Sequence, residues 1–332
     1  MRVVIDAMGS DNYPVPDVAG AVMAARQLDD TIVLVGNESA IKTELAKHDS
    51  GGLALEVVQA DQIITMEDKP SQVVREKRGS SMHVGMNLVK SGDADAFVTA
   101  GNTGAALAVA MLRSVGLGRI PGIKRPALGV IFPTPERPFL IDYGANADCR
   151  PEHLLQFAMM GSLYVERVLG IKEPRVALIS NGEEEGKGNI LVQETIPLLD
   201  TSGLNFVGNI EPKELMRGAA DVAVTDGFTG NILMKTAEAV ASYMSESIRK
   251  YIKSNPFTAV GGLLARPAFN RVKQHLDPDE VGGVPLLGIN GVVIIAHGSS
   301  SATAIKRAIE QARSVADKAV VEAIAVGIKQ EG

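Results

Sequence analysis

Two copies of a short motif contain the residue types best suited to bind a small oxyanion. The first copy spans residues 95–104 and the second spans residues 221–230, so the offset is 221 − 95 = 126, and six of the ten aligned positions are identical. Each copy predicts a buried strand, a glycine turn and a helix that begins at a Thr-Gly pair. Free backbone N–H groups at such a helix start bind anions, and glycine allows a ligand to approach closely. Two matched copies predict two loops that face each other across one cleft.

Other loops that follow predicted strands add further polar groups. Residues 180–189 contain three glycines, two asparagines and Lys187 immediately before a predicted helix, a composition that suits an anion. The three glutamates of this loop oppose an anion, and we expect them to face solvent or to bind Lys187. Residues 297–301 form another helix start that is able to receive an anion.

Neutral donors and a few cations dominate these loops, and this combination suits acyl transfer. Backbone N–H groups, Asn and Thr side chains, Lys187, Lys235 and His83 together would bind an oxyanion and stabilise the oxyanion that develops on a carbonyl group. The pattern favours transfer of an acyl group onto phosphate without a covalent enzyme intermediate. A lone histidine such as His83 is more often a packed or surface residue, so both interpretations stay open. Cys149 lies near a predicted helix start, which favours a lower pKa, but a buried structural thiol is the preferred interpretation.

The sequence lacks the residues that several other kinds of site require. The five histidines have neither the i, i+4 spacing nor the carboxylate neighbours of a zinc site. The Gly-Lys pair at 186–187 is not followed by the Ser or Thr of a P-loop, and the first loop offers no dinucleotide-binding Gly-x-Gly-x-x-Gly. A Gly-x-Ser-x-Gly nucleophile elbow is also missing. We therefore expect no metal and no cofactor.

Composition narrows the class of protein further. Of 332 residues, 45% are hydrophobic and only 4% aromatic, which fits tight packing of helices on a parallel sheet. A formal net charge of −6 argues against a general nucleic-acid-binding protein. Cys149 is the only cysteine, so we expect no intrachain disulfide and a reducing compartment. The sequence has no run of eighteen apolar residues to span a membrane, and the five apolar or acidic residues after Met1-Arg2 are too few for a signal-peptide core.

The elements that must position these loops alternate between strands and helices. This βαβ alternation predicts one three-layer α/β domain over residues 1–332, with a mostly parallel sheet and ligand-binding loops at the carboxyl ends of the strands. Asp17 is suited to cap the first helix. Strands are predicted at residues 2–5, 31–36, 53–58, 95–99, 127–132, 139–142, 175–179, 204–207 and 292–296, and helices at 38–47, 70–89, 103–115, 152–169, 211–217 and 230–253.

Five motifs together resemble one bacterial family. They are Asp-Ala-Met-Gly-Ser-Asp at 6–11, Ala-Gly-Asn-Thr-Gly-Ala at 100–105, Asp-Tyr-Gly-Ala-Asn at 142–146, Asn-Gly-Glu-Glu-Glu-x-Lys-Gly at 181–188 and Asp-Gly-Phe-Thr-Gly-Asn at 226–231. From end to end, the chain is similar to the acyl-acyl-carrier-protein:phosphate acyltransferases, the PlsX family. The resemblance implies the fold of the isocitrate/isopropylmalate dehydrogenase group, a homodimer, acyl carrier protein as the donor, and the first committed step of phosphatidic acid synthesis.

The paired loops and the resemblance together predict a mechanism. Inorganic phosphate is bound between the two loops and attacks the thioester carbonyl carbon of the acyl donor. Lys187, with Asn189 nearby, stabilises the tetrahedral oxyanion, and His83 or Lys235 assists the leaving thiol. The predicted phosphate contacts are Asn102, Thr103, Gly104, Thr229, Gly230 and Asn231. The predicted substrate site also includes Gly101, Asp142, Asn146, Asn181 and Asp226.

Three alternatives compete with this function. Residues 226–235 also resemble, more distantly, the phosphate loop of the phosphate acetyl- and butyryltransferases, which use coenzyme A. An NAD-dependent decarboxylating dehydrogenase of the same fold is disfavoured, because neither an aspartate cluster for a metal nor an Arg-rich carboxylate clamp is evident. A non-catalytic, membrane-associated scaffold for lipid enzymes belongs to a different class.

Two surface segments predict contacts with partners. Residues 118–126 form a basic, Pro/Gly-rich loop that is either a solvated connector or a contact for an acidic partner. Residues 255–269 are rich in large apolar side chains, contain two prolines and a Gly-Gly pair, and predict the tip of a helical hairpin at about 236–276. This tip either packs in a dimer or core, or dips into an anionic membrane. The second interpretation predicts a cytoplasmic enzyme at the inner face of the cell membrane, near a membrane glycerol-3-phosphate acyltransferase. The basic residues that flank the tip are Lys250, Lys253, Arg266, Arg271 and Lys273.

Overall fold

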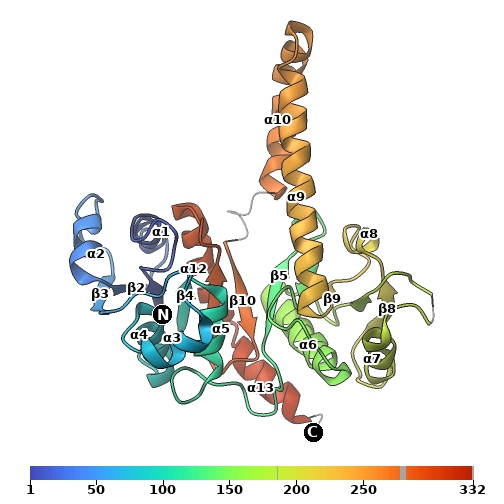
Figure 1. The fold of residues 1–332 in the computed structure, drawn as a ribbon, viewed down its shortest axis with the longest axis horizontal. Coiled ribbons are helices and arrows are strands. Elements are labelled where there is room, and N and C mark those ends of the chain that lie inside the picture. The colour runs from blue at the N-terminus through green and yellow to red at the C-terminus, as the bar shows by residue number, and fades with distance from the viewer. Residues whose placement is uncertain (185, 277–281, 331–332) are drawn as a thin grey trace.

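The alternating strands and helices of the sequence build one broad sheet with helices on both faces (Figure 1). The structure is a computed structural model that describes residues 1–184, 186–276 and 282–330, without the side chains of residues 270–276 and 330. The described strands are β1 (Arg2–Asp6), β2 (Thr31–Gly36), β3 (Leu55–Gln59), β4 (Ala96–Thr99), β5 (Ala127–Ile131), β6 (Phe139–Ile141), β7 (Val176–Ile179), β8 (Phe206–Ile210), β9 (Val222–Val224), β10 (Gly283–Leu287) and β11 (Val292–Ala296).

The sheet consists of two parallel wings joined by antiparallel strands. The strand order is β3-β2-β1-β4-β11-β10-β5-β6-β9-β7-β8. All neighbours from β3 to β11 are parallel, as are all neighbours from β6 to β8. The three pairs between the wings, β11 with β10, β10 with β5 and β5 with β6, are antiparallel. Because three reversals separate the wings, the strands of one wing run opposite to those of the other.

Two layers of helices cover the two faces of the sheet. In β1, Val3 and Ile5 pack on one face and Val4 packs on the other, as the alternation of side chains along a strand requires. The first face is covered by α1 (Val15–Ala25), α6 (Pro151–Tyr164), α7 (Ile190–Asp200), α12 (Ala302–Asp317) and α13 (Val320–Gln330). The second is covered by α3 (Pro70–Glu76), α4 (Ser81–Ser91), α5 (Thr103–Met111) and the start of α9 (Gly227–Ile252). The predicted three-layer, mostly parallel α/β fold is confirmed.

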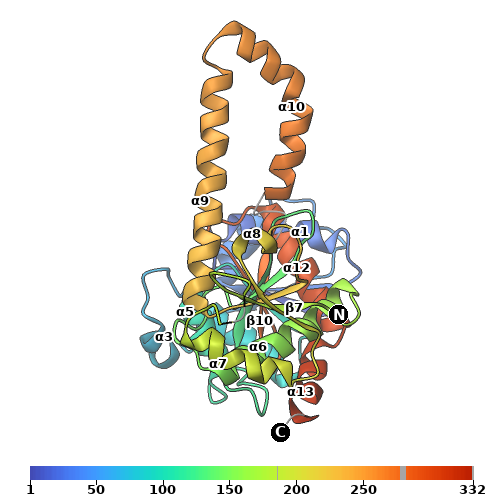
Figure 2. The same ribbon diagram turned by 90° about the vertical axis from the view of Figure 1, so that its right-hand side faces the viewer.

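A helical hairpin projects from this body, as predicted. Helix α9 leaves the sheet and runs beside α10 (Pro256–Leu276), and both extend far beyond the three layers (Figures 1 and 2). At 1.5 Å per residue, the 26 residues of α9 span about 39 Å. Apolar side chains on the hairpin are largely exposed, and the tip residue Phe257 is 90% exposed. No described helix is both long enough and apolar enough to cross a membrane.

Three local expectations are wrong. Asp17 does not cap α1, because Pro14 occupies the cap position and Asp17 is buried in the first turn, where its carboxylate accepts a hydrogen bond from Ser10. The predicted tip at residues 255–269 is mostly helix, since α10 begins at Pro256 and continues through the Gly-Gly pair and Pro267. The strand β10 is missing from the prediction, because its Gly-Val-Pro-Leu-Leu sequence carries a proline, which is uncommon within a sheet.

Candidate functional site

The opening motif of the chain packs directly under the first Thr-Gly loop. The buried carboxylate of Asp6 accepts a hydrogen bond from the Thr99 hydroxyl at 2.8 Å, and that hydroxyl accepts one from the Gly101 N–H at 3.0 Å. Burial raises the pKa of Asp6. A Cβ atom at Gly9 would lie 2.9 Å from the Gly101 nitrogen, so only glycine allows the two loops to approach this closely. This network gives the loop after β4 a rigid base.

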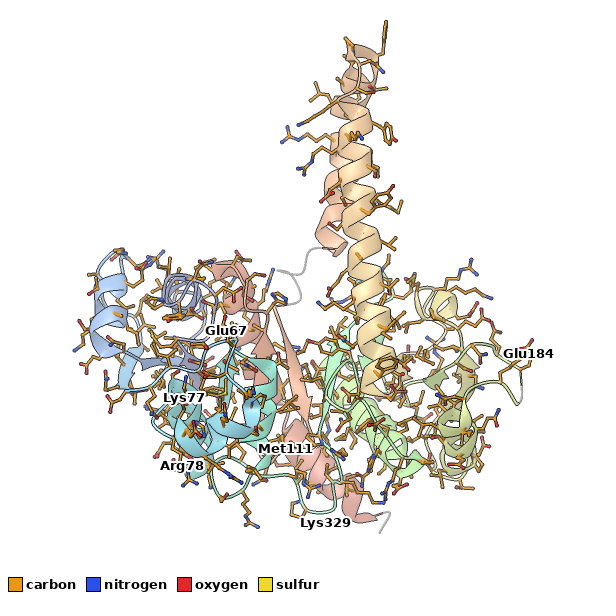
Figure 3. The ribbon with its side chains drawn as sticks, viewed as in Figure 1. Glu67, Lys77, Arg78, Met111, Glu184 and Lys329 are labelled. Atoms are coloured by element: carbon orange, nitrogen blue, oxygen red, sulfur yellow. The ribbon has the colours of Figure 1, made fainter. Side chains whose placement is uncertain are left out.

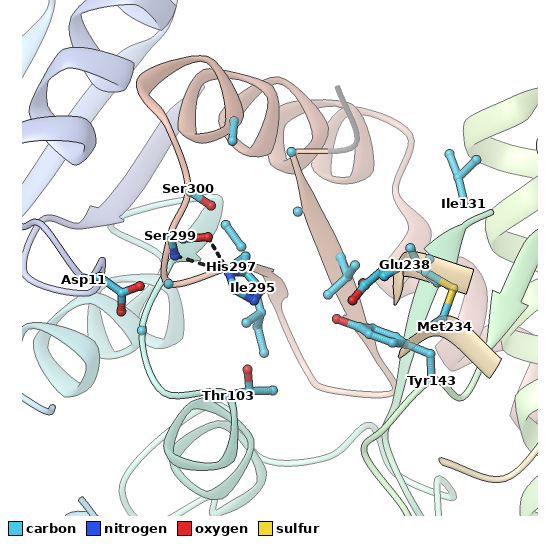
Figure 4. A pocket seen from close by; sticks show the side chains of 18 of the residues that line it. Asp11, Thr103, Ile131, Tyr143, Met234, Glu238, Ile295, His297, Ser299 and Ser300 are labelled. Carbon is cyan, nitrogen blue, oxygen red and sulfur yellow. Dashed lines mark hydrogen bonds between the residues drawn. The ribbon is translucent and has the colours of Figure 1, made fainter. Parts of the chain in front are cut away.

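A pocket of about 460 Å³ lies between the two wings. Its polar end comes from the loops after β1, β4 and β11, and its apolar end comes from β5, the loop after β6 and α9. Figure 4 shows these two ends on opposite sides of Ile295, with Asp11, Thr103, His297, Ser299 and Ser300 at one end and Ile131, Tyr143, Met234 and Glu238 at the other. The pocket therefore joins a surface of hydrogen-bonding groups to a hydrophobic one.

In the first Thr-Gly loop, Asn102 is structural and the helix start is open. The Asn102 Oδ1 atom accepts the Ala105 N–H and caps α5, while its amide nitrogen donates to the carbonyl groups of three residues of the 65–68 segment. No hydrogen bond among the described residues uses the N–H groups of Thr103 and Gly104. Gly101 and Thr103 line the pocket. These two N–H groups are thus available to an anion.

In the second Thr-Gly loop, most of the helix start is already occupied. Asp226 caps α9, and its carboxylate accepts both the N–H of Thr229 at 2.8 Å and its hydroxyl at 3.0 Å. The Gly227 N–H donates to Asn146, and the Gly230 N–H donates to the Asp226 carbonyl. Asn231 is exposed on the same side of α9 as Met234, one turn further along, which lines the pocket. Asn231 thus lies beside the pocket, although it is not among the lining residues.

Asp142 and Asn146 form a buried network that supports this second loop. The Asp142 carboxylate accepts hydrogen bonds from the N–H groups of Leu128, Gly144, Ala145 and Asn146 and from the Asn146 amide. Burial raises the pKa of Asp142, while these donors oppose that shift. These hydrogen bonds order the loop after β6. Because they already occupy the buried Asp142 carboxylate, little of it remains to contact a substrate.

The predicted catalytic residues lie apart from one another. His83 is buried in α4, with Nδ1 2.9 Å from the Ser80 hydroxyl, and burial followed by the charge of Arg78 lowers its pKa. Lys235 is exposed on α9 and pairs at 2.8 Å with Glu238, which lines the pocket.

The predicted oxyanion donor lies on the loop after β7, which is outside the pocket lining. Figure 3 shows Glu184 of this loop at the far edge of the molecule. Lys187 is exposed there, Asn181 accepts the Gly188 N–H, and Asn189 caps α7. Whether Lys187 and Asn189 contact a substrate stays a prediction.

The predicted site omits several residues of the polar end of the pocket. His297 and Ser299 are exposed there, and Ser300 is 7% exposed. The sequence signal for these residues is the helix start at 297–301, which the pattern identifies as able to receive an anion. Asp11 closes the opening motif, and its place in the pocket depends on the contact between the loops after β1 and β11, which sequence spacing does not reveal. Among the described residues, no group of three or more His, Cys, Asp or Glu side chains is placed to hold a metal ion.

Comparison with known proteins assigns the chain to a family. The profile described as fatty acid synthesis protein (FA_synthesis) matches residues 1–323. The chain belongs to this family. Among curated relatives, "Phosphate acyltransferase" of Elusimicrobium minutum is 46% identical over 98% of this chain and 95% of its own length. "Phosphate acyltransferase" of Alkaliphilus oremlandii is also 46% identical, over 100% of this chain and 98% of its own. The resemblance to the PlsX family is confirmed, and the protein is an acyltransferase.

Solved structures support the fold of this FA_synthesis member. The branched-chain phosphotransacylase from Enterococcus faecalis V583 superposes with a TM-score of 0.60 at 13% identity, over 95% of this chain and 99% of that one. The EutD phosphotransacetylase from Staphylococcus aureus gives a TM-score of 0.58 at 15% identity, over 95% and 94%. At these identities the similarity demonstrates a shared fold and nothing more specific.

Proposed function

We propose that this enzyme transfers a long-chain fatty acyl group from acyl-acyl carrier protein to inorganic phosphate, and that the acyl phosphate supplies phosphatidic acid and phospholipid synthesis. Membership of a family whose curated relatives are named phosphate acyltransferase is the observation that carries this proposal. The pocket supports it, because it joins hydrogen-bonding groups, which suit phosphate, to an apolar surface, which suits an acyl chain. Fixed neutral donors also stabilise an oxyanion that develops on the thioester carbonyl.

The chemistry requires no covalent enzyme intermediate and no net proton from the enzyme. An oxygen of hydrogen phosphate bonds to the thioester carbonyl carbon, the carbon–sulfur bond breaks, and the sulfur leaves with the electron pair. The proton that hydrogen phosphate carried ends on the sulfur, so the products are acyl phosphate and thiol. Cys149 is poorly suited to intercept the acyl group, because burial, and then the charges of Asp142 and Asp226, raise the pKa of its thiol to about 12.

One assay with the purified chain separates the candidate functions. Given long-chain acyl-acyl carrier protein and phosphate, the protein should form acyl phosphate in a phosphate-dependent reaction that needs no NAD. Faster turnover of acetyl- or butyryl-coenzyme A would instead support a short-chain phosphotransacylase. Stable binding of the acyl donor without any turnover would support the scaffold.

Lys187 lies outside the pocket lining, so its predicted role as oxyanion donor can be tested directly. The loop after β7 would have to move toward the pocket before the Lys187 ammonium group could reach the thioester carbonyl. We expect Lys187→Ala to lower kcat and leave the phosphate KM nearly unchanged. Unchanged kcat would remove Lys187 from the mechanism and leave the donors of the pocket to stabilise the oxyanion.

Two basic surfaces are candidates for docking an acidic carrier protein. Lys124 and Arg125 are exposed, but they lie before the first residue of β5, whereas Ile131 at the other end of this strand lines the pocket. Five residues of strand separate them by about 17 Å. Arg249 and Lys250 are exposed on the projecting part of α9. Charge reversal of either pair should raise the donor KM at low salt and spare the phosphate KM, and comparing the two variants identifies the docking surface.

The projecting hairpin supports peripheral contact with an anionic membrane, and its exposed face is equally available to a second protomer of a homodimer. Leu263 and Leu264 are 66% and 78% exposed. Lys250, Lys253 and Arg266 are exposed nearby, while the side chains of Arg271 and Lys273 are outside the described part of the chain. Several partly buried apolar side chains, each worth up to about 1.5–3 kcal/mol, suffice for reversible attachment.

A double substitution tests the tip against a matched control. Leu263→Glu with Leu264→Glu should release the protein from anionic vesicles and leave activity on the soluble donor largely intact. Ile190→Glu with Val207→Glu adds the same charge at exposed apolar positions away from the hairpin, and this variant should stay bound. If the first variant instead unfolds or changes its oligomeric state, the tip belongs to a protein interface. If the tip is the interface of a homodimer, any contact with the membrane or with a membrane glycerol-3-phosphate acyltransferase must use another surface.

A further inference from the structure

The polar end of the pocket contains a serine hydroxyl group that has no hydrogen-bond partner among the described residues. Ser300 is 7% exposed, lines the pocket, and directly precedes the cap residue of α12. Among the described residues, no hydrogen bond is made by its side chain, whereas its backbone N–H donates to the His297 carbonyl at 2.9 Å. The rest of Ser300 is buried, and its hydroxyl oxygen is not among the fully buried unpaired atoms, so this hydroxyl borders the pocket and is available to a ligand.

His297 is held in one tautomer beside this hydroxyl group. Its Nδ1 atom lies 3.2 Å from the Ser299 N–H, which can only donate, and 2.8 Å from the Ser299 hydroxyl (Figure 4). Nδ1 is therefore the acceptor, and in the neutral ring the hydrogen is on Nε2. His297 lines the pocket and thus offers it an Nε2–H donor. Thr103 adds its hydroxyl and the open N–H of the α5 start.

A carboxylate lies among these donors, and within the described part of the chain no lysine or arginine does. The Asp11 N–H donates to the Gly298 carbonyl at 2.8 Å, and a Cβ atom on Gly298 would lie 2.7 Å from the Asp11 Oδ1 atom. Asp11 is thereby fixed against the His297–Ser299 turn, and no described residue donates a hydrogen bond to its carboxylate. None of the described residues that line the pocket is a lysine or an arginine. A fully deprotonated oxyanion would meet repulsion here, whereas an oxyanion that keeps one hydrogen could donate it to Asp11.

We propose that this end of the pocket is a seat for a protonated oxyanion, formed by Thr103, His297 and Ser300 as donors and Asp11 as the acceptor. The inference rests on the proposed function and identifies the substrate form as hydrogen phosphate, which keeps a proton at neutral pH, while sulfate does not. Three donors bind the unprotonated oxygens, and Asp11 accepts the P–O–H group. This hydrogen is the one that ends on the sulfur when acyl phosphate forms, so Asp11 also orients it within the seat.

Discrimination between phosphate and sulfate tests the seat. We expect sulfate to be a poor competitor of phosphate in wild-type acyl phosphate formation. Asp11→Asn replaces the acceptor by an amide that can also donate, and it should shift the ratio of sulfate Ki to phosphate KM toward sulfate by about tenfold or more, equal to about 1.4 kcal/mol. Glu238→Gln makes the same change at the apolar end of the pocket and should leave that ratio unaltered. An equal ratio in wild type and Asp11→Asn, or an equal shift in both variants, would overturn the proposal.

Direct binding separates this inference from the proposed function. By calorimetry, inorganic phosphate should bind wild type, bind Ser300→Ala and His297→Ala more weakly, and recover most of its affinity in His297→Gln, whose amide restores a donor. Loss of affinity in none of these variants would place the phosphate elsewhere, even if the enzyme forms acyl phosphate. Phosphate binding to the seat without acyl phosphate formation from any thioester would instead refute the proposed function and leave the seat intact.

Discussion

The two Thr-Gly loops share their residues but not their structure. In the first, the cap residue is Asn102 and the helix begins at Thr103; in the second, the cap residue is Asp226 and the helix begins at Gly227. With the motif offset of 126, Asp226 aligns with Ala100, so the second helix begins two positions earlier. Thr103 is therefore the first residue of its helix with an open N–H, whereas Thr229 is the third and is bound to Asp226. Equal residue types at equal spacing thus produce one open anion site and one largely occupied helix start.

The largest expected effect comes from the glycines of the two pairs. A Cβ atom at Gly230 would lie 2.1 Å from the Asp142 carbonyl oxygen and 2.9 Å from the Tyr143 Cα atom, both backbone atoms that cannot move independently. A Cβ atom at Gly104 would lie 2.8 Å from the Pro70 ring. We expect Gly230→Ala to prevent stable folding at physiological temperature and Gly104→Ala to cost roughly 1–3 kcal/mol. Circular dichroism shows whether Gly230→Ala folds, and the urea midpoint at unchanged m-value measures the cost of Gly104→Ala. A Gly230→Ala variant that folds with the same midpoint as Gly104→Ala would contradict the distinction between the loops.

Buried carboxylates under the two wings give the next effect. Asp142 is surrounded by N–H donors, but Asp17 has one hydroxyl donor and a buried Oδ1 without a partner among the described residues. Burial raises the pKa of Asp17 to about 7. Because the folded state holds this proton more tightly than the unfolded state, the free energy of unfolding should fall as the pH rises from about 4 to about 7, by up to about 4 kcal/mol.

An isosteric variant isolates the contribution of Asp17. Asp17→Asn cannot ionise, so its free energy of unfolding should improve relative to wild type across this pH range and level off above it. Urea titrations at several pH values measure the difference. Relative to wild type, Asp142→Asn should change with pH in the same direction, because burial also raises the pKa of Asp142, but it should be less stable than wild type at low pH because it removes an acceptor from the backbone donors around it. A constant difference between Asp17→Asn and wild type at every pH would mean that Asp17 is already ionised in the folded protein.

Substitutions of the two aligned threonines, Thr103 and Thr229, test the same difference between the loops with smaller expected effects. Thr229→Val removes the hydroxyl bond to Asp226 and should cost about 0.5–1.5 kcal/mol of stability, with little change in the phosphate KM. Thr103→Val removes a hydroxyl from the pocket and should spare stability, while raising the phosphate KM about tenfold, as expected for a hydrogen bond to a charged group. The reverse pattern would assign the phosphate to the second loop.

The sequence predicts the fold well because its signals are local. Short apolar runs identify most strands of both wings, their alternation with helical segments indicates the fold class, and the five motifs identify the family. The relative direction of the wings depends on β10, which pairs with the neighbouring β11 and with the remote β5, and whose Pro285 obscures the strand pattern. The cap residue differs between the loops, because the first loop has Asn102 where the second has Phe228, and the second has Asp226 where the first has Ala100. The shared motif positions do not indicate this difference. The seat around Asp11 and His297 combines loops more than 280 residues apart, 297 − 11 = 286, so no spacing rule predicts it.

The smallest effect is expected at Cys149, which belongs to the supporting network of the second loop. Its Sγ atom lies 3.6 Å from the Asn146 carbonyl oxygen, and the thiol stays protonated because burial raises its pKa to about 12. Serine preserves a donor to this carbonyl, so Cys149→Ser should keep kcat and both KM values within about twofold, a difference of about 0.4 kcal/mol. Steady-state kinetics with acyl-acyl carrier protein and phosphate measure this. A radiolabelled acyl chain trapped on Cys149 during turnover would contradict direct transfer. It would also assign a chemical role to the second wing, where most N–H groups at the start of α9 already have hydrogen-bond partners.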